Sequence, residues 1–198
     1  MLSRRKLLMT ASAAIGLMAS GHLGLAQEAK LPVVASFSIV GDIVQNIGGD
    51  RISLTTLVQP GSDAHVYTPT PADAKAVANA RLVVANGLRF EGWVNRLMQA
   101  SASKAAMVEA AAGVKGRKEE AAQGHNHGGL DPHAWQSVAN VRLYAANIRD
   151  GLIVADPAGK ATYEDNARRY LAELDTLEEE IKAAIARIPA DRRKVITS

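Results

Sequence analysis

Short apolar runs alternate with helical patterns along most of this chain, and this alternation restricts the fold more than any other feature. The run 31–37 is apolar and rich in β-branched residues, and after it apolar side chains recur three and four residues apart until Gly48-Gly49. The same order returns in predicted strands at 52–58, 82–86 and 106–108 and predicted helices at 71–80, 93–100 and 138–152. Such an order predicts the α/β class, with a parallel sheet flanked by helices.

A second helical pattern, much longer than the others, begins after Asp156. Apolar residues recur three and four apart from Tyr163 to Ile188, Pro157 fits the first helical position, and Pro189 ends the pattern. Asp156 is the expected N-cap. The segment 156–189 therefore predicts a helix of roughly 45 Å, longer than a small domain is wide, and we expect it to connect the α/β lobe at 27–155 to something beyond it.

The first residues have the pattern of an export signal. Three consecutive basic residues at 4–6 precede an apolar run, and Gly24-Leu25-Ala26 fits a small-residue cleavage site. We predict a cleaved signal at 1–26 and a periplasmic location. An uncleaved membrane anchor is the alternative, although glycine and serine interrupt the apolar run. The paired arginines fit a twin-arginine signal and general secretion equally well.

Charge and cysteine content exclude several classes of function. Three of the 23 basic residues and none of the 20 acidic ones precede Gln27, which leaves 20 of each in the predicted mature chain. A neutral chain gives no support to a nucleic-acid partner, which would need a clustered basic face. Because cysteine is absent, any bound metal must be held by nitrogen and oxygen ligands.

Two histidines lie in turns that follow predicted strands. His65 stands among glycine and proline residues in the segment 60–71, and His133 follows Asp131-Pro132. Ligands of parallel sheets bind outside the carboxyl ends of the strands, so we expect both histidines at that edge. Two imidazoles there predict half of a metal site, because zinc usually takes about four ligands. Taken singly, each histidine would more simply be a surface turn residue.

Further candidates surround these two residues. Asp63 and Glu91 are candidate acceptors that would orient a ligand imidazole. The segment 111–130 is predicted to be a mobile surface loop, and it contains His125 and His127. This pair either captures metal weakly and passes it inward, or is incidental in a glycine-rich loop.

The motifs around the two histidines resemble those of the ZnuA/TroA type, the solute-binding proteins that feed bacterial ABC importers for zinc and manganese. The family pattern Pro-Gly-x-Asp-x-His-x-Tyr-x-Pro-x-Pro matches 60–71, and Asp-Pro-His-x-Trp matches 131–135. The segment 86–93 and the long helix, with its Tyr163, Asn166 and Tyr170, also resemble family segments. The likeness covers essentially the whole predicted mature chain.

The resemblance implies a two-lobed, monomeric, non-enzymatic protein that binds metal in a cleft and delivers it to an ABC permease in the membrane. His65 and His133 would be its first two ligands, and 190–198 would be the first strand of a truncated second lobe. The third ligand, usually histidine, would follow that strand, and a carboxylate would come later. The histidine-containing loop favours Zn²⁺ as the metal, with Mn²⁺ as the alternative.

Two other functions compete with this interpretation. A zinc hydrolase would also use two histidines and a carboxylate, but no His-Glu-x-x-His helix and no glutamate beside either histidine is present. A metal-dependent adhesin, a role attached to some relatives, finds no adhesive patch in the sequence.

Overall fold

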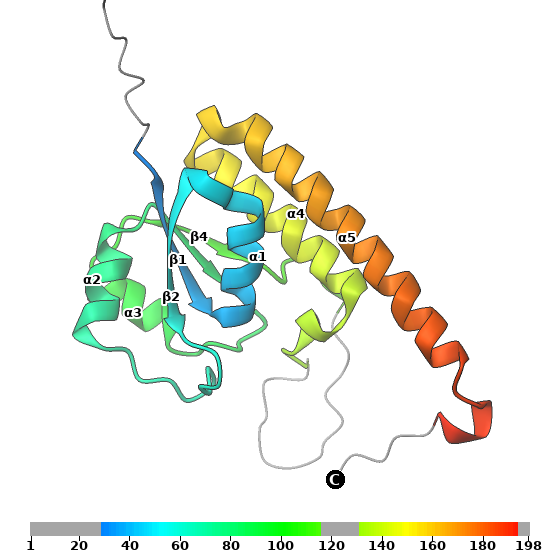
Figure 1. Cartoon of the computed structure of the whole chain (residues 1–198). Coiled ribbons are helices and arrows are strands. Elements are labelled where there is room, and N and C mark those ends of the chain that lie inside the picture. The colour runs from blue at the N-terminus through cyan, green and yellow to red at the C-terminus, as the bar shows by residue number, and fades with distance from the viewer. Residues whose placement is uncertain (1–28, 116–130, 194–198) are drawn as a thin grey trace, which may run out of the picture.

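The computed structural model describes residues 29–115 and 131–193. Four parallel strands form one sheet in the order β2-β1-β3-β4, as Figure 1 shows. The strands are β1 (Leu31–Phe37), β2 (Ile52–Val58), β3 (Leu82–Ala85) and β4 (Ala106–Glu109). The predicted α/β class and parallel sheet are thereby confirmed. In this order the chain changes direction between β1 and β3, the position where such sheets leave a crevice.

Helices cover both faces of the sheet (Figure 1). One face carries α1 (Ser38–Gly48) and α4 (Val138–Ala155), while the other carries the shorter α2 (Pro71–Asn79) and α3 (Val94–Ala100). The long α5 (Lys160–Ala186) packs on α1 and α4 as an outer layer. The helices end close to the residues that the sequence pattern predicts.

Sequence patterns explain why these helices form where they do. In α1 the apolar residues three and four apart are fully buried against the sheet, namely Val40, Ile43, Val44 and Ile47. In α2 the Thr70 hydroxyl accepts from the Asp73 amide while the Asp73 carboxylate accepts from the Thr70 amide, which is a capping box. Pro71 occupies the first turn, where its missing N–H costs nothing.

The start of α5 differs from the prediction. A short 3₁₀ turn (Pro157–Gly159) precedes the helix, and the Asp156 side chain does not cap it. The Asp156 carboxylate instead receives two hydrogen bonds from Arg51, at 3.0 and 3.3 Å, and one from the Tyr163 hydroxyl at 2.7 Å. Arg51 holds the pKa of Asp156 below its usual value, and burial together with this carboxylate raises the pKa of Tyr163 to about 12.

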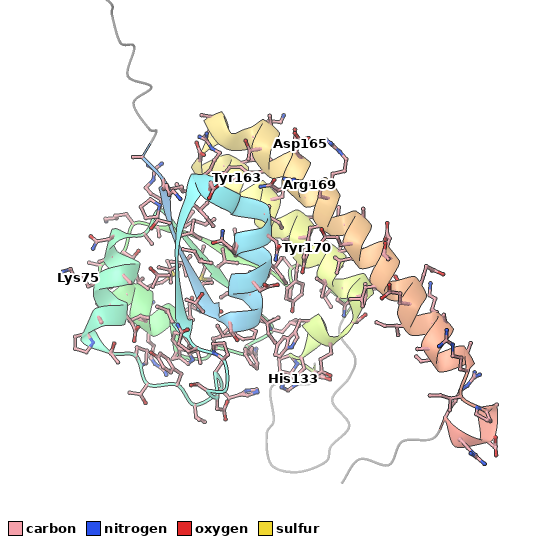
Figure 2. The ribbon with its side chains drawn as sticks, in the orientation of Figure 1. Lys75, His133, Tyr163, Asp165, Arg169 and Tyr170 are labelled. Carbon is pink, nitrogen blue, oxygen red and sulfur yellow. The ribbon has the colours of Figure 1, made fainter. Side chains whose placement is uncertain are left out.

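Along its length α5 changes from a buried to an exposed helix. Asn166 donates to the Ile47 carbonyl of α1 at 2.9 Å, and Arg142 of α4 pairs with Asp175 and Glu178. Figure 2 shows the labelled residues Tyr163, Arg169 and Tyr170 on this anchored half. Beyond it, the α5 side chains of Leu177, Ile181 and Ile185 are more than two-fifths exposed, as is Ile188 just after the helix.

Three predictions fall on residues outside the described ranges. These are the export signal at 1–26, the loop histidines His125 and His127, and the later part of the strand expected at 190–198. The described start of that segment is a 3₁₀ turn (Ala190–Arg192) and not a strand. Within residues 29–115 and 131–193, no helix combines the length and apolar character that crossing a membrane requires.

Candidate metal centre

His65 and His133 meet at the carboxyl edge of the sheet. His65 lies in the connection between β2 and α2, and His133 precedes a 3₁₀ turn (Ala134–Gln136) that leads into α4. Figure 2 places His133 at the edge of the lobe below α4. The Nε2 atoms of the two rings are 3.1 Å apart, although 68 residues separate them in the sequence. Both histidines are partly exposed.

A carboxylate from its own turn orients His133. Asp131 Oδ1 lies 2.8 Å from His133 Nδ1 and accepts the His133 backbone N–H at 2.9 Å. When the imidazole is neutral, this carboxylate favours the tautomer with the proton on Nδ1, and the lone pair of Nε2 then points toward His65. Sequence reasoning overlooked Asp131 as an orienting group, although an aspartate two residues before a histidine is a signal for such a turn.

The two carboxylates expected to orient an imidazole have other partners. Asp63 Oδ1 accepts the backbone N–H of His65 at 2.8 Å and so shapes the loop. Glu91 Oε1 accepts from the Ser36 hydroxyl at 2.5 Å and from the Asn86 backbone amide at 2.7 Å. Glu91 is buried, and burial raises the pKa of its carboxyl group while these hydrogen bonds oppose the rise. Both residues therefore support the backbone around the site.

Aromatic rings enclose the histidine pair on its inner side. Phe90 packs edge-on against both imidazoles, with centroid distances of 4.3 Å to His65 and 5.7 Å to His133. Trp135 lies 5.3 Å from His133, and Phe37 at the end of β1 contacts both Phe90 and Trp135 at 5.1 Å. An apolar wall of this kind limits ring rotation and raises the electrostatic attraction between the nitrogens and a cation.

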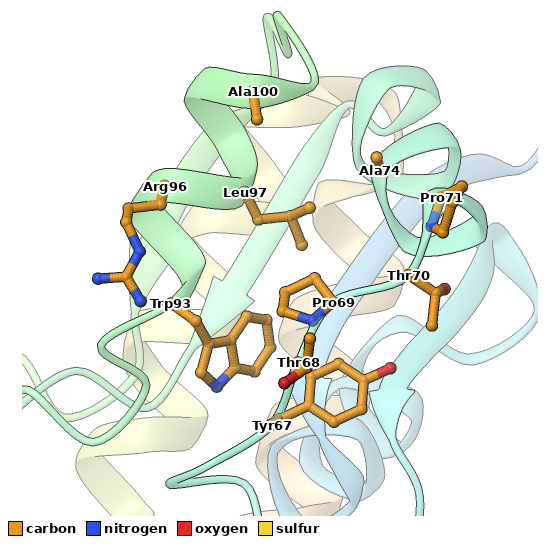
Figure 3. Close-up of a pocket in the computed structure, with 10 residues that line it drawn as sticks. All are labelled: Tyr67, Thr68, Pro69, Thr70, Pro71, Ala74, Trp93, Arg96, Leu97 and Ala100. Carbon is orange, nitrogen blue, oxygen red and sulfur yellow. The ribbon is translucent and has the colours of Figure 1, made fainter.

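A separate groove lies between α2 and α3, beside the His65 loop (Figure 3). Its volume is about 490 Å³, and its lining includes Tyr67 and Trp93 at one end and Ala74, Leu97 and Ala100 farther along. Neither histidine lines this groove. The groove is therefore distinct from the histidine pair.

The described residues supply two strong candidate ligands. No group of three or more His, Asp or Glu side chains within 29–115 and 131–193 is placed to hold one ion. Metal–nitrogen bonds of about 2.1 Å would make the 3.1 Å separation an N–metal–N angle of about 95°, between the octahedral and tetrahedral values. The pair can thus be part of a larger ligand set.

Known proteins are similar to this chain in sequence and in fold. The profile of the zinc-uptake complex component A periplasmic family, ZnuA, matches residues 33–198. The manganese-binding lipoprotein MntA of Halalkalibacterium halodurans is 38% identical over 189 residues, covering 93% of this chain and 61% of the relative. The manganese ABC transporter substrate-binding lipoprotein PsaA of Streptococcus anginosus is 38% identical over 185 residues, covering 91% and 60%. The chain thus spans about three-fifths of the length of these relatives.

Solved structures agree with the sequence relatives. The Mn-bound periplasmic metal-binding protein of Candidatus Liberibacter asiaticus has a TM-score of 0.75 at 34% identity, covering 86% of this chain and 62% of that one. Zn(II)-bound AdcA of Streptococcus pneumoniae has a TM-score of 0.67 at 26% identity, covering 77% and 32%. From its parallel sheet, its long outer helix and the profile match over 33–198, we conclude that this chain belongs to the ZnuA family of periplasmic metal-uptake components.

Proposed function

We propose that this chain is the metal-capturing lobe of an exported solute-binding protein that delivers a divalent transition-metal ion to an ABC importer. The observation that carries the proposal is the 3.1 Å approach of the His65 and His133 Nε2 atoms at the sheet edge, with His133 oriented by Asp131. The relatives support it, because they are named as metal-binding or metal ABC transporter substrate-binding lipoproteins. They are binding proteins and not hydrolases.

Binding would exchange a ring-to-ring contact for two metal bonds. A 3.1 Å contact between two Nε2 atoms without metal places a proton on one of them, because two lone pairs would repel. The Asp131 contact favours His133 as the acceptor and His65 as the donor in this contact. For His65 to bind a cation through Nε2, its ring must carry the proton on Nδ1 instead, so that Nε2 presents its lone pair. Because only the neutral imidazoles can bind, metal capture should weaken as the pH falls and the rings gain a second proton.

Manganese is at least as good a candidate as zinc for the cargo. The relatives MntA and PsaA are named for manganese, and the Liberibacter protein is Mn-bound, whereas AdcA is Zn(II)-bound. Sequence reasoning favoured zinc because of His125 and His127, which lie outside the described residues. Imidazole ligands favour zinc, whereas carboxylate and water ligands favour manganese, so the ligands beyond these two histidines would decide between the ions.

The proposed location is extracytoplasmic, and the proposed partner is a membrane permease. The predicted signal at 1–26 supports export, and the relatives are named as lipoproteins or periplasmic proteins. A substrate-binding component of an ABC importer needs a permease to receive its ion. The proposal includes no nucleic acid.

Calorimetric titration of the purified chain with Mn²⁺ and with Zn²⁺ tests the proposal. His65→Ala and His133→Ala should each abolish most of the binding, because each removes one of two convergent ligands. The matched control is the double variant His125→Ala, His127→Ala, which should leave equilibrium affinity nearly unchanged. A loss in this control as large as that of His65→Ala would make the loop the primary site.

A further inference from the structure

The connection between β3 and α3, residues 86–93, carries neither histidine but contacts both histidine-bearing segments. It begins with the buried Asn86 and ends with the buried Trp93. Phe90, in its middle, is the ring that packs edge-on against both imidazoles. We call this segment the 86–93 connection.

Asn86 ties the connection to the His133 turn. Its side-chain Nδ2 donates to the Pro132 carbonyl at 3.0 Å and to the Gly87 carbonyl at 3.0 Å, and its Oδ1 accepts from the Tyr144 hydroxyl at 2.5 Å. Asn86 and Tyr144 are fully buried. Because the hydroxyl must face Oδ1, Tyr144 fixes the amide so that Nδ2 points at Pro132, the residue before the proposed ligand.

Trp93 ties the other end to the His65 loop. Its indole Nε1–H donates to the Ala64 carbonyl at 2.8 Å, again at the residue before a proposed ligand. Tyr67 packs on the indole with ring centroids 5.1 Å apart, and Figure 3 shows the two rings together at one end of the groove. The residue before each histidine therefore has its carbonyl hydrogen-bonded by a buried side chain of the 86–93 connection.

The connection is itself braced. Glu91 Oε1 accepts hydrogen bonds from the Asn86 backbone amide and from the Ser36 hydroxyl, which ties the connection to the end of β1. Between these points the chain turns sharply, with the Phe90 amide bonded to the Gly87 carbonyl at 3.0 Å. Leu88 and Arg89, at φ +53° and +61°, adopt the left-handed conformation that side chains other than glycine disfavour. Such backbone persists only where the surroundings fix it.

We propose that the 86–93 connection sets the separation of the two imidazoles, with Asn86, Trp93 and Tyr144 as positioning residues. The expected effect on metal affinity rests on the proposed function. The expected effect on the separation of the two rings needs no bound metal. If either anchor is released, the histidine on that side moves away from its partner.

Two single variants release the anchors one at a time. Tyr144→Phe removes the hydroxyl that orients Asn86, and Trp93→Phe removes the donor to Ala64. Tyr163→Phe is the matched control, because it also removes a hydroxyl from a buried tyrosine but at the Asp156 end of the molecule. Circular dichroism and thermal unfolding of the metal-free proteins establish that each variant folds.

The first measurement needs no metal. In the metal-free full chain, nuclear Overhauser contacts between the ring protons of His65 and His133 should be present in the wild type and in Tyr163→Phe. They should weaken or vanish in Tyr144→Phe and Trp93→Phe. Unchanged contacts in both folded variants would overturn the proposal.

The second measurement is titration with Mn²⁺ and Zn²⁺. Each anchor variant should lose about tenfold in affinity, as is typical when groups that orient ligands are removed, and Tyr163→Phe should lose less than twofold. The double variant should lose well under 100-fold, because one release already frees the pair. A full 100-fold loss would show two independent supports and overturn the single-connection proposal. If the wild type shows the ring contacts but binds neither ion, the proposed function is refuted and the positioning role still stands.

Discussion

The two histidine-bearing segments reach the same point by different means. The His133 turn is short and supplies its own orienting group, because Asp131 bonds both the backbone and the ring of His133. The His65 loop follows β2 for more than ten residues without helix or strand, and its Val66 is 75% exposed. There Asp63 bonds the backbone, while Phe90 packs on the ring from another segment. The His133 ring is therefore oriented by its own turn in addition to tertiary packing, whereas the His65 ring packs against another segment.

The largest expected difference between the two segments comes from their aspartates. Asp131→Asn should lower Mn²⁺ and Zn²⁺ affinity by about 10- to 100-fold, because the neutral amide holds the Nδ1 proton less strongly than a carboxylate does and raises the basicity of the imidazole less. Asp63→Asn should change affinity by less than about threefold, since an amide oxygen still accepts the His65 N–H. Calorimetry at pH 7 measures both. Equal affinity losses in the two variants would mean that both imidazoles depend on their aspartates to the same extent.

Sequence reasoning found the sheet and most helices because their patterns are local. Strands such as 52–58 and the apolar stripe of α1 can be read from residue spacing alone, and the structure places them within a residue or two. The start of α5 was predicted wrongly, because the sequence Asp156-Pro157 has the pattern of a helix cap and the structure does not use it. Arg51, 105 residues away in the sequence, takes the carboxylate instead, and no local pattern reveals such a partner.

In the candidate site too, some features could be predicted from the sequence and others depend on tertiary packing. The meeting of His65 and His133 followed from the rule that the ends of parallel strands share an edge, and their ring nitrogens do meet. The orienting role of Asp131 could have been inferred from its spacing to His133. The roles of Phe90 and Asn86 could not, because they depend on how the 86–93 connection folds across the two segments.

A site remote from both segments tests whether affinity differences merely reflect stability. Asp156→Asn replaces the carboxylate that pairs with Arg51 and Tyr163, and should lower the free energy of unfolding by about 1–2 kcal/mol at pH 7. Metal affinity should stay within twofold of the wild type. A parallel loss of affinity would mean that general stability, and not local orientation, controls both histidines.

This variant also has a defined pH dependence. Because the folded-state pKa of Asp156 is lowered from 3.8, its stabilising contribution is complete above that unfolded-state value. The contribution is lost as the pH falls through the lower folded-state pKa. Urea unfolding should therefore show a constant difference between wild type and Asp156→Asn at pH 7 and 5. The two curves should approach each other only under more acidic conditions.

The smallest expected effect concerns the strained backbone of the 86–93 connection, which lies between the two histidine-bearing segments. Arg89 is exposed and left-handed, so Arg89→Gly should raise the free energy of unfolding by about 0.5–1 kcal/mol. Gly87→Ala is the opposite control, because its φ is +86° and a Cβ would lie 3.1 Å from Glu109 Cβ, so it should destabilise. Urea unfolding measures both. If Arg89→Gly also weakens metal binding, a stiff turn at Arg89 is needed to hold Phe90 against both rings; unchanged affinity would show that the anchors at Asn86 and Trp93 suffice.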